Sequence, residues 1–356
     1  MLTTLAAPAF ADIWHIEDGD ITVKASGTEG KNTVSQGNKK DVEDTNTIIT
    51  NRDKNTASSH TVTIEAGNDK VEVTLKDVNI KADSGSALTS KGDVTLTLKG
   101  DNHLTGGISD NGNYGLSGIS SSGSLTISGG ETDSLTAQGG SGTDGSGGRG
   151  IFSKDLTISG GTVNANGGNG SKSESSDRSN GGRGIDSGSL TVSGGTVTAT
   201  GGDGCSGSYS DGGIGISSSS GGVTISGGMV TANGGSGNIS GGDGICSDSG
   251  DVTISGGTVT ATGGDSTSSV GSGGSGISSN GSLTITGGEN DSLTAKGGSG
   301  RSGIFSSGGV TISGGTVNAT GGSSGSDSGD GIHSGSLTMK GGTVNALSLI
   351  HISEPT

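Results

Sequence analysis

The sequence has few aromatic side chains, few prolines and few basic residues. Phe, Trp and Tyr make up 2% of the 356 residues, and there are two prolines and two cysteines. Lys and Arg number 19 against 35 Asp and Glu, so the formal net charge is −16 and the isoelectric point about 4.5. We do not expect so acidic a chain to bind a nucleic-acid backbone or an anionic membrane. We find no segment that is long and apolar enough to predict a membrane span.

The two cysteines leave their redox state open. Cys205 lies in a stretch of variable sequence, and Cys246 lies about one repeat further on. In a secreted protein they either form a disulfide or remain two small unpaired residues, and the sequence alone does not decide between these alternatives. We find no Cys and His spacing typical of a zinc site.

The chain is rich in glycine, with 79 residues, and it repeats one unit eight times. The clearest copy contains Gly-Ile-Asp-Ser at 184–187, Leu-Thr-Val-Ser-Gly-Gly at 190–195 and Thr-Val-Thr-Ala-Thr at 196–200. The isoleucine of the first segment anchors the eight copies at Ile119, Ile151, Ile185, Ile216, Ile245, Ile277, Ile304 and Ile332.

The spacing within the unit is partly fixed and partly free. The second segment begins five to seven residues after the anchoring isoleucine, and the third follows seven residues later in six copies. In the other two copies that offset is ten, because Glu-Thr-Asp or Glu-Asn-Asp follows the double glycine. The stretch from the third segment to the next Gly-Ile varies about twofold in length. A disordered low-complexity chain of similar composition has no reason to keep such offsets.

Apolar and polar residues alternate with period two in every segment, which predicts β-strands rather than amphipathic helices. Strands repeated in series predict a solenoid whose coils stack Ile on Ile, Leu on Leu and Val on Val. The predicted fold class is all-β, a right-handed parallel β-helix with three short strands per coil of about 27–34 residues. The double glycines between the second and third segments are expected to form sharp turns with positive φ.

Four regions are expected along the chain. Residues 1–11 look like the remnant of a secretory signal that ends small-x-small at 9–11, which favours a secreted or cell-surface protein. Residues 12–107 carry longer alternating runs and are expected to form irregular coils that cap the solenoid. Residues 108–346 are the regular coils. Residues 347–356 resemble the peptide encoded by sequencing-adapter DNA, and we expect a non-native tail there.

The position before each Gly-Ile pair is the best place to look for catalysis. Arg149 and Arg183 are expected to stack on consecutive coils, with Asp186 close by. A polysaccharide hydrolase needs two carboxylates, and a lyase needs a base with a cation or metal. Solvated surface charges are the alternative. Among the histidines only His333 falls inside the repeat, and we interpret it as a surface residue.

Aspartates in the glycine-rich stretches are candidate calcium ligands. Carboxylates and backbone carbonyls in glycine-rich turns suit Ca²⁺, although the nonapeptide calcium-binding repeat is not present. Solvated loop aspartates are the alternative. The candidate metal ligands are Asp203, Asp211, Asp243, Asp265 and Asp330.

Rows of threonine are predicted on the outward faces of the strands. Such rows can hydrogen-bond a long, regular ligand such as a glycan, and they also resemble ice-binding surfaces. Threonine suits an exposed strand in any case because of its high β propensity. The candidate ligand-binding residues are Thr157, Thr191, Thr224 and Thr253 in one row, and Thr198, Thr231 and Thr260 in another.

Two parts of the sequence carry a family resemblance. The run from Val71 to Gly106 and the later Leu-Thr-Ile-Ser-Gly-Gly-Thr-Val coils resemble secreted bacterial proteins described as carbohydrate-binding domain-containing β-helices, similar in shape to polysaccharide lyases. The resemblance implies a right-handed β-helix, binding to acidic or cellulosic plant polysaccharide, and calcium. It assigns no individual binding residue.

Three functions follow as hypotheses. The first is a non-catalytic extracellular or cell-surface protein that binds polysaccharide of plant cell-wall type, with or without calcium. The second is a structural stalk or adhesin whose variable loops contact a host or cell-surface partner. The third is a polysaccharide lyase. We expect no enzymatic activity under the first two.

Overall fold

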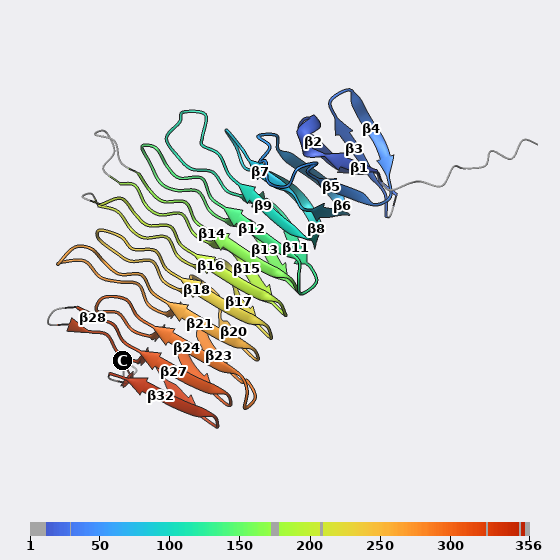
Figure 1. Ribbon diagram of the computed structural model, residues 1–356. Helices are drawn as coiled ribbons and strands as arrows, with labels where there is room; N and C mark the ends of the chain where they lie inside the picture. Colours follow the sequence, from blue (N-terminus) through green and yellow to red (C-terminus); the bar gives the residue numbers. More distant parts are fainter. Residues whose placement is uncertain are drawn as a thin grey trace, which may run out of the picture.

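The computed structural model describes residues 12–28, 30–171, 178–206, 209–324, 327–348 and 350–352. These residues form 33 β-strands and one short 3₁₀ helix, η1 (Ile16–Asp18). Figure 1 shows an elongated stack of coils, each with strands on one side and a long finger of extended chain on the other. The expected signal remnant at 1–11 lies outside the described residues, as do residues 353–356.

The N-terminal region contains strands of unequal length. They are β1 (Ile13–His15), β2 (Ile21–Ala25), β3 (Asn32–Gln36), β4 (Lys39–Asp44), β5 (Thr47–Thr50), β6 (Val62–Lys76), β7 (Asn79–Lys81), β8 (Leu88–Lys99) and β9 (Asp101–Thr105).

The regular coils and the end of the chain contain the remaining strands. They are β10 (Ile119–Ser121), β11 (Ser124–Ser128), β12 (Ser134–Gln138), β13 (Ile151–Ile158), β14 (Thr162–Asn166), β15 (Ile185–Val192), β16 (Thr196–Thr200), β17 (Ile216–Ile225), β18 (Met229–Asn233), β19 (Ile245–Ser247), β20 (Val252–Ile254), β21 (Thr258–Thr262), β22 (Ile277–Ser279), β23 (Ser282–Ile285), β24 (Ser292–Lys296), β25 (Ile304–Ser306), β26 (Gly309–Ile312), β27 (Thr316–Thr320), β28 (Ser323–Ser324), β29 (Asp327–Ser328), β30 (Ile332–Ser334), β31 (Leu337–Met339), β32 (Thr343–Leu347) and β33 (Ile350–Ile352).

Two large sheets run the length of the stack. Sheet A has 21 strands and contains the first and second segments of each repeat, which join into single strands in β13, β15 and β17. Sheet B has ten strands, from β7 to β32, and contains the third segments. The pairs are parallel, and each coil hydrogen-bonds to its copy in the next, as β14 does to β16. The antiparallel exceptions lie at β2–β3, β3–β4 and β28–β29.

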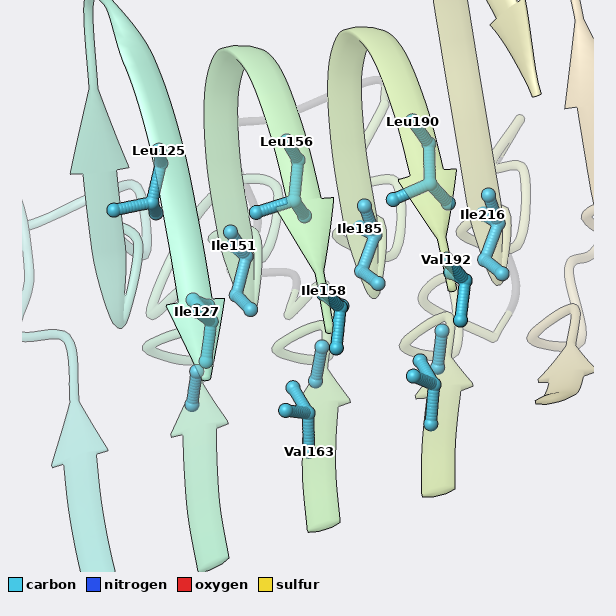
Figure 2. Packing of buried hydrophobic residues seen from close by; sticks show 14 of the residues in the cluster. Leu125, Ile127, Ile151, Leu156, Ile158, Val163, Ile185, Leu190, Val192 and Ile216 are labelled. Atoms are coloured by element: carbon cyan, nitrogen blue, oxygen red, sulfur yellow. The ribbon is translucent and has the colours of Figure 1, made fainter. Parts of the chain in front are cut away.

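The core consists of apolar rows that stack coil on coil. Ile151 pairs with Ile185, Leu156 with Leu190, and Ile158 with Val192. Figure 2 shows these rows side by side between the two sheets, and the core isoleucines are fully buried. The period-two alternation therefore predicted the inward faces correctly.

A buried serine closes the first segment of each repeat. The row runs parallel to the isoleucines, and several members donate to a carbonyl a few residues on, as Ser247 does to Gly250 O at 2.7 Å. At these positions serine suits the corner because its hydroxyl bonds the local backbone, whereas the hydroxyls of Ser90, Ser153 and Ser187 are buried without a hydrogen-bond partner. The row contains Ser90, Ser121, Ser153, Ser187, Ser218, Ser247, Ser279, Ser306 and Ser334.

The double glycines between sheets A and B form the expected turns. In six copies the second glycine has φ between 72° and 86°, as in Gly161 and Gly257. The two copies with the ten-residue offset use a carboxylate instead. Asp133 accepts N–H groups from Gly130 at 2.8 Å and from Gly100 of the preceding coil at 2.9 Å. Asp291 does the same for Gly288 and Gly257.

In the part of the chain that the structure describes, the stretches between sheet B and the next Gly-Ile form extended fingers. Each finger leaves sheet B, runs outward and returns to sheet A (Figure 1). Its outgoing and returning arms are joined by backbone bonds, such as Gly213 N to Gly202 O at 2.8 Å, and a similar bond from Gly202 N to Gly182 O joins it to the previous finger.

These bonds form one continuous glycine ladder along the third side of the solenoid. A Cβ on Gly202 would overlap the carbonyl oxygen of Gly168, and one on Gly213 would overlap that of Gly182. At these two positions glycine is required by close backbone approach and not by positive φ. The ladder contains Gly107, Leu116, Gly140, Gly148, Gly168, Gly182, Gly202, Gly213, Gly235, Gly242, Gly264, Gly274, Gly298, Arg301, Gly322 and Gly329.

The N-terminal region closes one end of the core. The hairpin β3–β4 follows β2, and its Val34 is buried with the core. Buried polar groups fix it there: Trp14 Nε1 donates to Asp44 Oδ2 at 2.9 Å, and Asn32 Nδ2 donates to Thr47 Oγ1 at 3.0 Å. We call this arrangement the cap; the division of the chain at residue 107 stays a prediction.

At the other end, β33 pairs in parallel with β30, Ile350 opposite Ile332. The origin of residues 347–356 stays a prediction.

Candidate functional site

The outward face of sheet A carries an unbroken row of threonines, which we call the threonine lane. Thr157 pairs with Thr191, which pairs with Thr224, and Thr224 pairs with Thr253. These side chains are half-exposed or exposed. The complete lane is Thr126, Thr157, Thr191, Thr224, Thr253, Thr284, Thr311 and Thr338.

The outward face of sheet B carries three parallel rows, of which the central one is wholly polar, while the flanking rows include the exposed Met229 and Leu347. Its central row, the sheet B row, brings Thr198, Thr231 and Thr260 into register. At the C-terminal end of this row, Asn345 Nδ2 donates to Asn318 Oδ1 at 2.8 Å. The sheet B row is Thr136, Asn164, Thr198, Thr231, Thr260, Thr294, Asn318 and Asn345.

Both rows repeat at the distance between neighbouring strands, about 4.8 Å. A hydroxyl or amide is therefore presented at regular intervals over eight coils. Each hydroxyl can donate one hydrogen bond and accept two, and each amide can do both. The faces suit a long, regular ligand rich in hydroxyl groups.

The residues considered for catalysis do come together. Asp186 is buried, and both of its carboxylate oxygens are engaged: Oδ1 by Arg183 Nη1 at 3.0 Å and Oδ2 by Arg149 Nε. The Arg149 guanidinium also lies 5.0 Å from the centre of the Phe152 ring. The carboxylate is thus committed to joining two coils through charged hydrogen bonds. This contact gives the three residues a structural role.

In a later coil, Asp243 occupies the repeat position of Arg149 and Arg183, and Cys246 occupies that of Asp186. Burial raises the pKa of Asp243, although its Oδ1 accepts the Ser275 N–H at 2.6 Å. Burial also raises the pKa of the Cys246 thiol well above its ordinary value, and the nearby Asp243 adds to the shift. A thiol in this environment is a poor nucleophile. Cys205 and Cys246 are not joined by a disulfide, which answers the question that the sequence left open.

His333 lies in the last of the eight repeats, where it pairs with Phe305 of the preceding coil. Its Nδ1 lies 2.9 Å from Asp330 Oδ2, and its ring stacks on Phe305 with centroids 5.4 Å apart. The side chain is 31% exposed and has both of these partners, which agrees with its interpretation as a satisfied surface histidine.

A comparison with protein families finds the same units in the sequence. A family model described as "Beta helix repeat" matches residues 156–171, 190–218, 223–245, 252–281 and 310–336. The chain is a parallel β-helix. Neither the curated proteins nor the solved structures contain a match to it.

The five aspartates proposed as calcium ligands lie apart on the β-helix. Asp203 and Asp265 occupy the same position in fingers two coils apart, about 10 Å from each other. Each accepts a backbone N–H from the next coil, Asp203 from Ser236 and Asp265 from Ser299. Asp211 lies on the returning arm of a finger, while Asp243 and Asp330 lie beside sheet A.

The structure therefore does not gather these aspartates into one site. Within the described ranges, we find no group of three or more His, Cys, Asp or Glu side chains placed to hold a metal ion. Likewise, no helix in these ranges is long and apolar enough to cross a membrane.

A polar hollow, which the repeat pattern does not predict, lies at the N-terminal end of the threonine lane. It has a volume of about 760 Å³ and lies between the β2–β3 turn, the turn at Thr45 and Asn46, and the outer face of β6 and β8. Its lining comes from the irregular coils, where the repeat gives no alignment. Only the unusual polarity of the turn residues 26–32 and 45–46 marked this region in the sequence.

Proposed function

We propose that the protein is a non-catalytic, extracellular or cell-surface β-helix that binds polysaccharide along its polar rows. The observation that carries this proposal is the register of the threonine lane, which holds a hydroxyl at the same position in eight successive coils. The spacing of about 4.8 Å between coils is close to the length of a sugar ring along an extended chain.

The chemistry of the rows supports a glycan more than a protein partner. Each contact would be a single weak hydrogen bond, so affinity would come from many contacts along one polymer. The rows belong to rigid sheets, so little side-chain or backbone freedom would be lost on binding. Since aromatic residues make up only 2% of the chain, stacking on sugar rings would contribute little.

The test is retention on a panel of insoluble and acidic polysaccharides, with calcium and again with a chelator. Two matched variants locate the binding face: one changes Thr157, Thr191, Thr224 and Thr253 to Val, the other changes Thr198, Thr231 and Thr260 to Val. Valine keeps the β-branched shape and removes the hydroxyl. Saturable retention that one variant loses and the other keeps would support the proposal. Lack of retention on every polymer, with the fold intact by circular dichroism, would exclude it.

Calcium is a separate part of this proposal. Loss of retention with the chelator would support a calcium-assisted binder, and Asp211→Asn would then be compared with wild type. Unchanged retention would remove calcium from the function.

The finger tips favour the second candidate, a structural stalk or adhesin. Tyr209 is 69% exposed and Val270 is 89% exposed, and both lie at finger tips. Exposed apolar side chains at the ends of fingers of unequal length suit contact with a protein surface. Binding to cells that survives both threonine variants and is lost in a Tyr209→Ser, Val270→Ser double variant would favour this function. Release of unsaturated sugars from pectin would instead reveal lyase activity.

A further inference from the structure

The polar hollow is continuous with the threonine lane. Thr126 pairs with Thr95 of β8, and Thr95 pairs with Glu72 of β6, which lines the hollow. The neighbouring outward row runs in the same way from Ser128 to Thr97 and Thr74, both of which line it. The hollow and the lane therefore share one outward face.

The far side of the hollow is walled. The described residues between β2 and β3 and the turn that carries Thr45 and Asn46 border it, and the neighbouring Asn32 and Asp44 make the cap contacts described above. Asn32 is 7% exposed, and its Nδ2 also donates to Glu72 O at 3.0 Å, which ties the wall to the floor. A polymer lying along the lane would meet this wall.

The lining suits a neutral, hydroxyl-rich ligand. Two cations, Lys31 and Lys70, are balanced by two anions, Asp69 and Glu72, and the rest of the polar lining is mainly hydroxyl and amide groups. Sugar hydroxyls both donate and accept, so they match ammonium donors, carboxylate acceptors and amides together. An anionic ligand would meet the two carboxylates. Two other hollows, of about 310 Å³ and 210 Å³, are smaller than this one.

We propose that the hollow is a saccharide-binding site that holds the end of a neutral polysaccharide chain whose body lies along the threonine lane. The proposal rests on the proposed function for the body of the chain. The site itself is separate, because its walls come from the cap and its floor from β6 and β8.

Filling the hollow tests the site. Thr97 faces it from the floor, and Thr97→Phe would occupy the space with a side chain that strands tolerate. Thr286 occupies the same position in a distant coil and is exposed, so Thr286→Phe is the matched control. Asn46→Ala, which removes an exposed amide from the wall, is a second variant that leaves the sheet unchanged.

The probes are neutral cello- and xylo-oligosaccharides of graded length, with galacturonic acid oligomers as the acidic arm. Binding is measured by calorimetry, and the emission of Trp14, the only tryptophan, reports on the cap because its ring bonds Asp44 beside the Thr45–Asn46 turn. Thr97→Phe is expected to weaken binding of a neutral oligomer by at least about tenfold, and Thr286→Phe to leave it unchanged. Equal binding by wild type and Thr97→Phe, or no binding of any oligomer by wild type, would overturn the proposal.

The threonine-to-valine variant of the lane separates this proposal from the proposed function. If the lane variant loses polymer retention but still binds oligomers, the end site and the lane both stand. Such a variant would still bind chain ends through the hollow. The amount of it bound at saturation should therefore rise as a polymer is cut into shorter chains, since the number of ends rises. If polymer retention survives in the lane variant while oligomers still bind, only the role of the lane fails. Preference for the acidic oligomers would overturn the assignment to a neutral chain.

Discussion

Glycine has two distinct roles in this solenoid at the scale of single residues. The second glycine of each turn between sheets A and B has a positive φ, which L side chains rarely adopt. The glycines of the ladder do not have a positive φ, and they are needed because two chains pass too close for a Cβ. In the composition both kinds appear only as a high glycine content. The repeated double glycines predict the turns, but no pattern in the sequence predicts the ladder.

The ladder predicts a sharp difference between two glycine-to-alanine changes. Gly202→Ala should lower the free energy of unfolding by about 3 kcal/mol, because its Cβ would overlap backbone that cannot move without breaking the ladder. Gly288→Ala is the control, since the nearest atom to its Cβ would be 3.5 Å away and its φ is not positive. Denaturant midpoints of both variants check this. Similar midpoints would show that the fingers are looser than the ladder implies.

The inserted aspartates make a second residue-scale point. The N–H groups of Gly130 and Gly100, with the Lys99 ammonium, hold the pKa of Asp133 below its usual value. The ionised form is therefore favoured in the folded protein, and its contribution to stability is present at neutral pH and lost as the pH falls below about 4.

In Asp133→Asn, folding stability should accordingly depend less on pH at acidic pH than it does in wild type. The variant is expected to unfold at a lower temperature than wild type at pH 7, and the difference should shrink as the pH is lowered. Glu131→Gln, in the same inserted turn but exposed, is the control and should follow wild type. The measurement is thermal unfolding followed by circular dichroism, from pH 7 down to below about pH 4. A constant difference between Asp133→Asn and wild type would contradict the assignment.

At the scale of elements, the strands could be predicted because the alternation within each short segment shows which of its side chains point toward the core. In Thr-Val-Thr-Ala-Thr at 196–200, Val197 and Ala199 alternate with threonines. The copies of this segment in the two neighbouring coils pair with it residue by residue. The fingers could not be predicted in the same way, because their bonds join glycines that have no side-chain pattern. The cap hairpin and the hollow were missed for a related reason: β3 and β4 occur once, so no second copy fixes their alignment.

The difference between strands and fingers predicts where an extra residue is tolerated. One glycine inserted after Val230 in β18 should turn Ala232 outward and expose it, since a single-residue slip reverses every following side chain. The same insertion after Ser268, at a finger tip, should change the free energy of unfolding by only about 0.5 kcal/mol. Soluble yield and denaturant midpoints compare the two. If the β18 insertion is as stable as wild type, the register in sheet B is not fixed by its apolar face.

At the scale of the whole molecule, each coil contacts mainly its neighbours, so stability is a sum of coil and interface terms. The candidate site has the same form: no single residue makes the threonine lane, which exists only because eight coils keep one register. The candidate residues of the lane could thus be named from the sequence, while the aspartates could not be combined into a site. The spacing of the aspartates along the chain does not predict which part of its coil each of them occupies.

The net charge of −16 makes the last prediction one about the whole molecule. At low ionic strength the protein repels acidic polymers over about 10 Å or more, whereas at high ionic strength this repulsion is screened. Retention on a neutral polysaccharide should therefore be nearly independent of salt, because uncharged hydrogen bonds hold it. Retention on an acidic polysaccharide should rise with salt. If retention on an acidic polymer falls as salt is added, Arg149, Arg183 and their neighbours attract the ligand. The binding face would then be the surface around these two arginines and not the threonine lane.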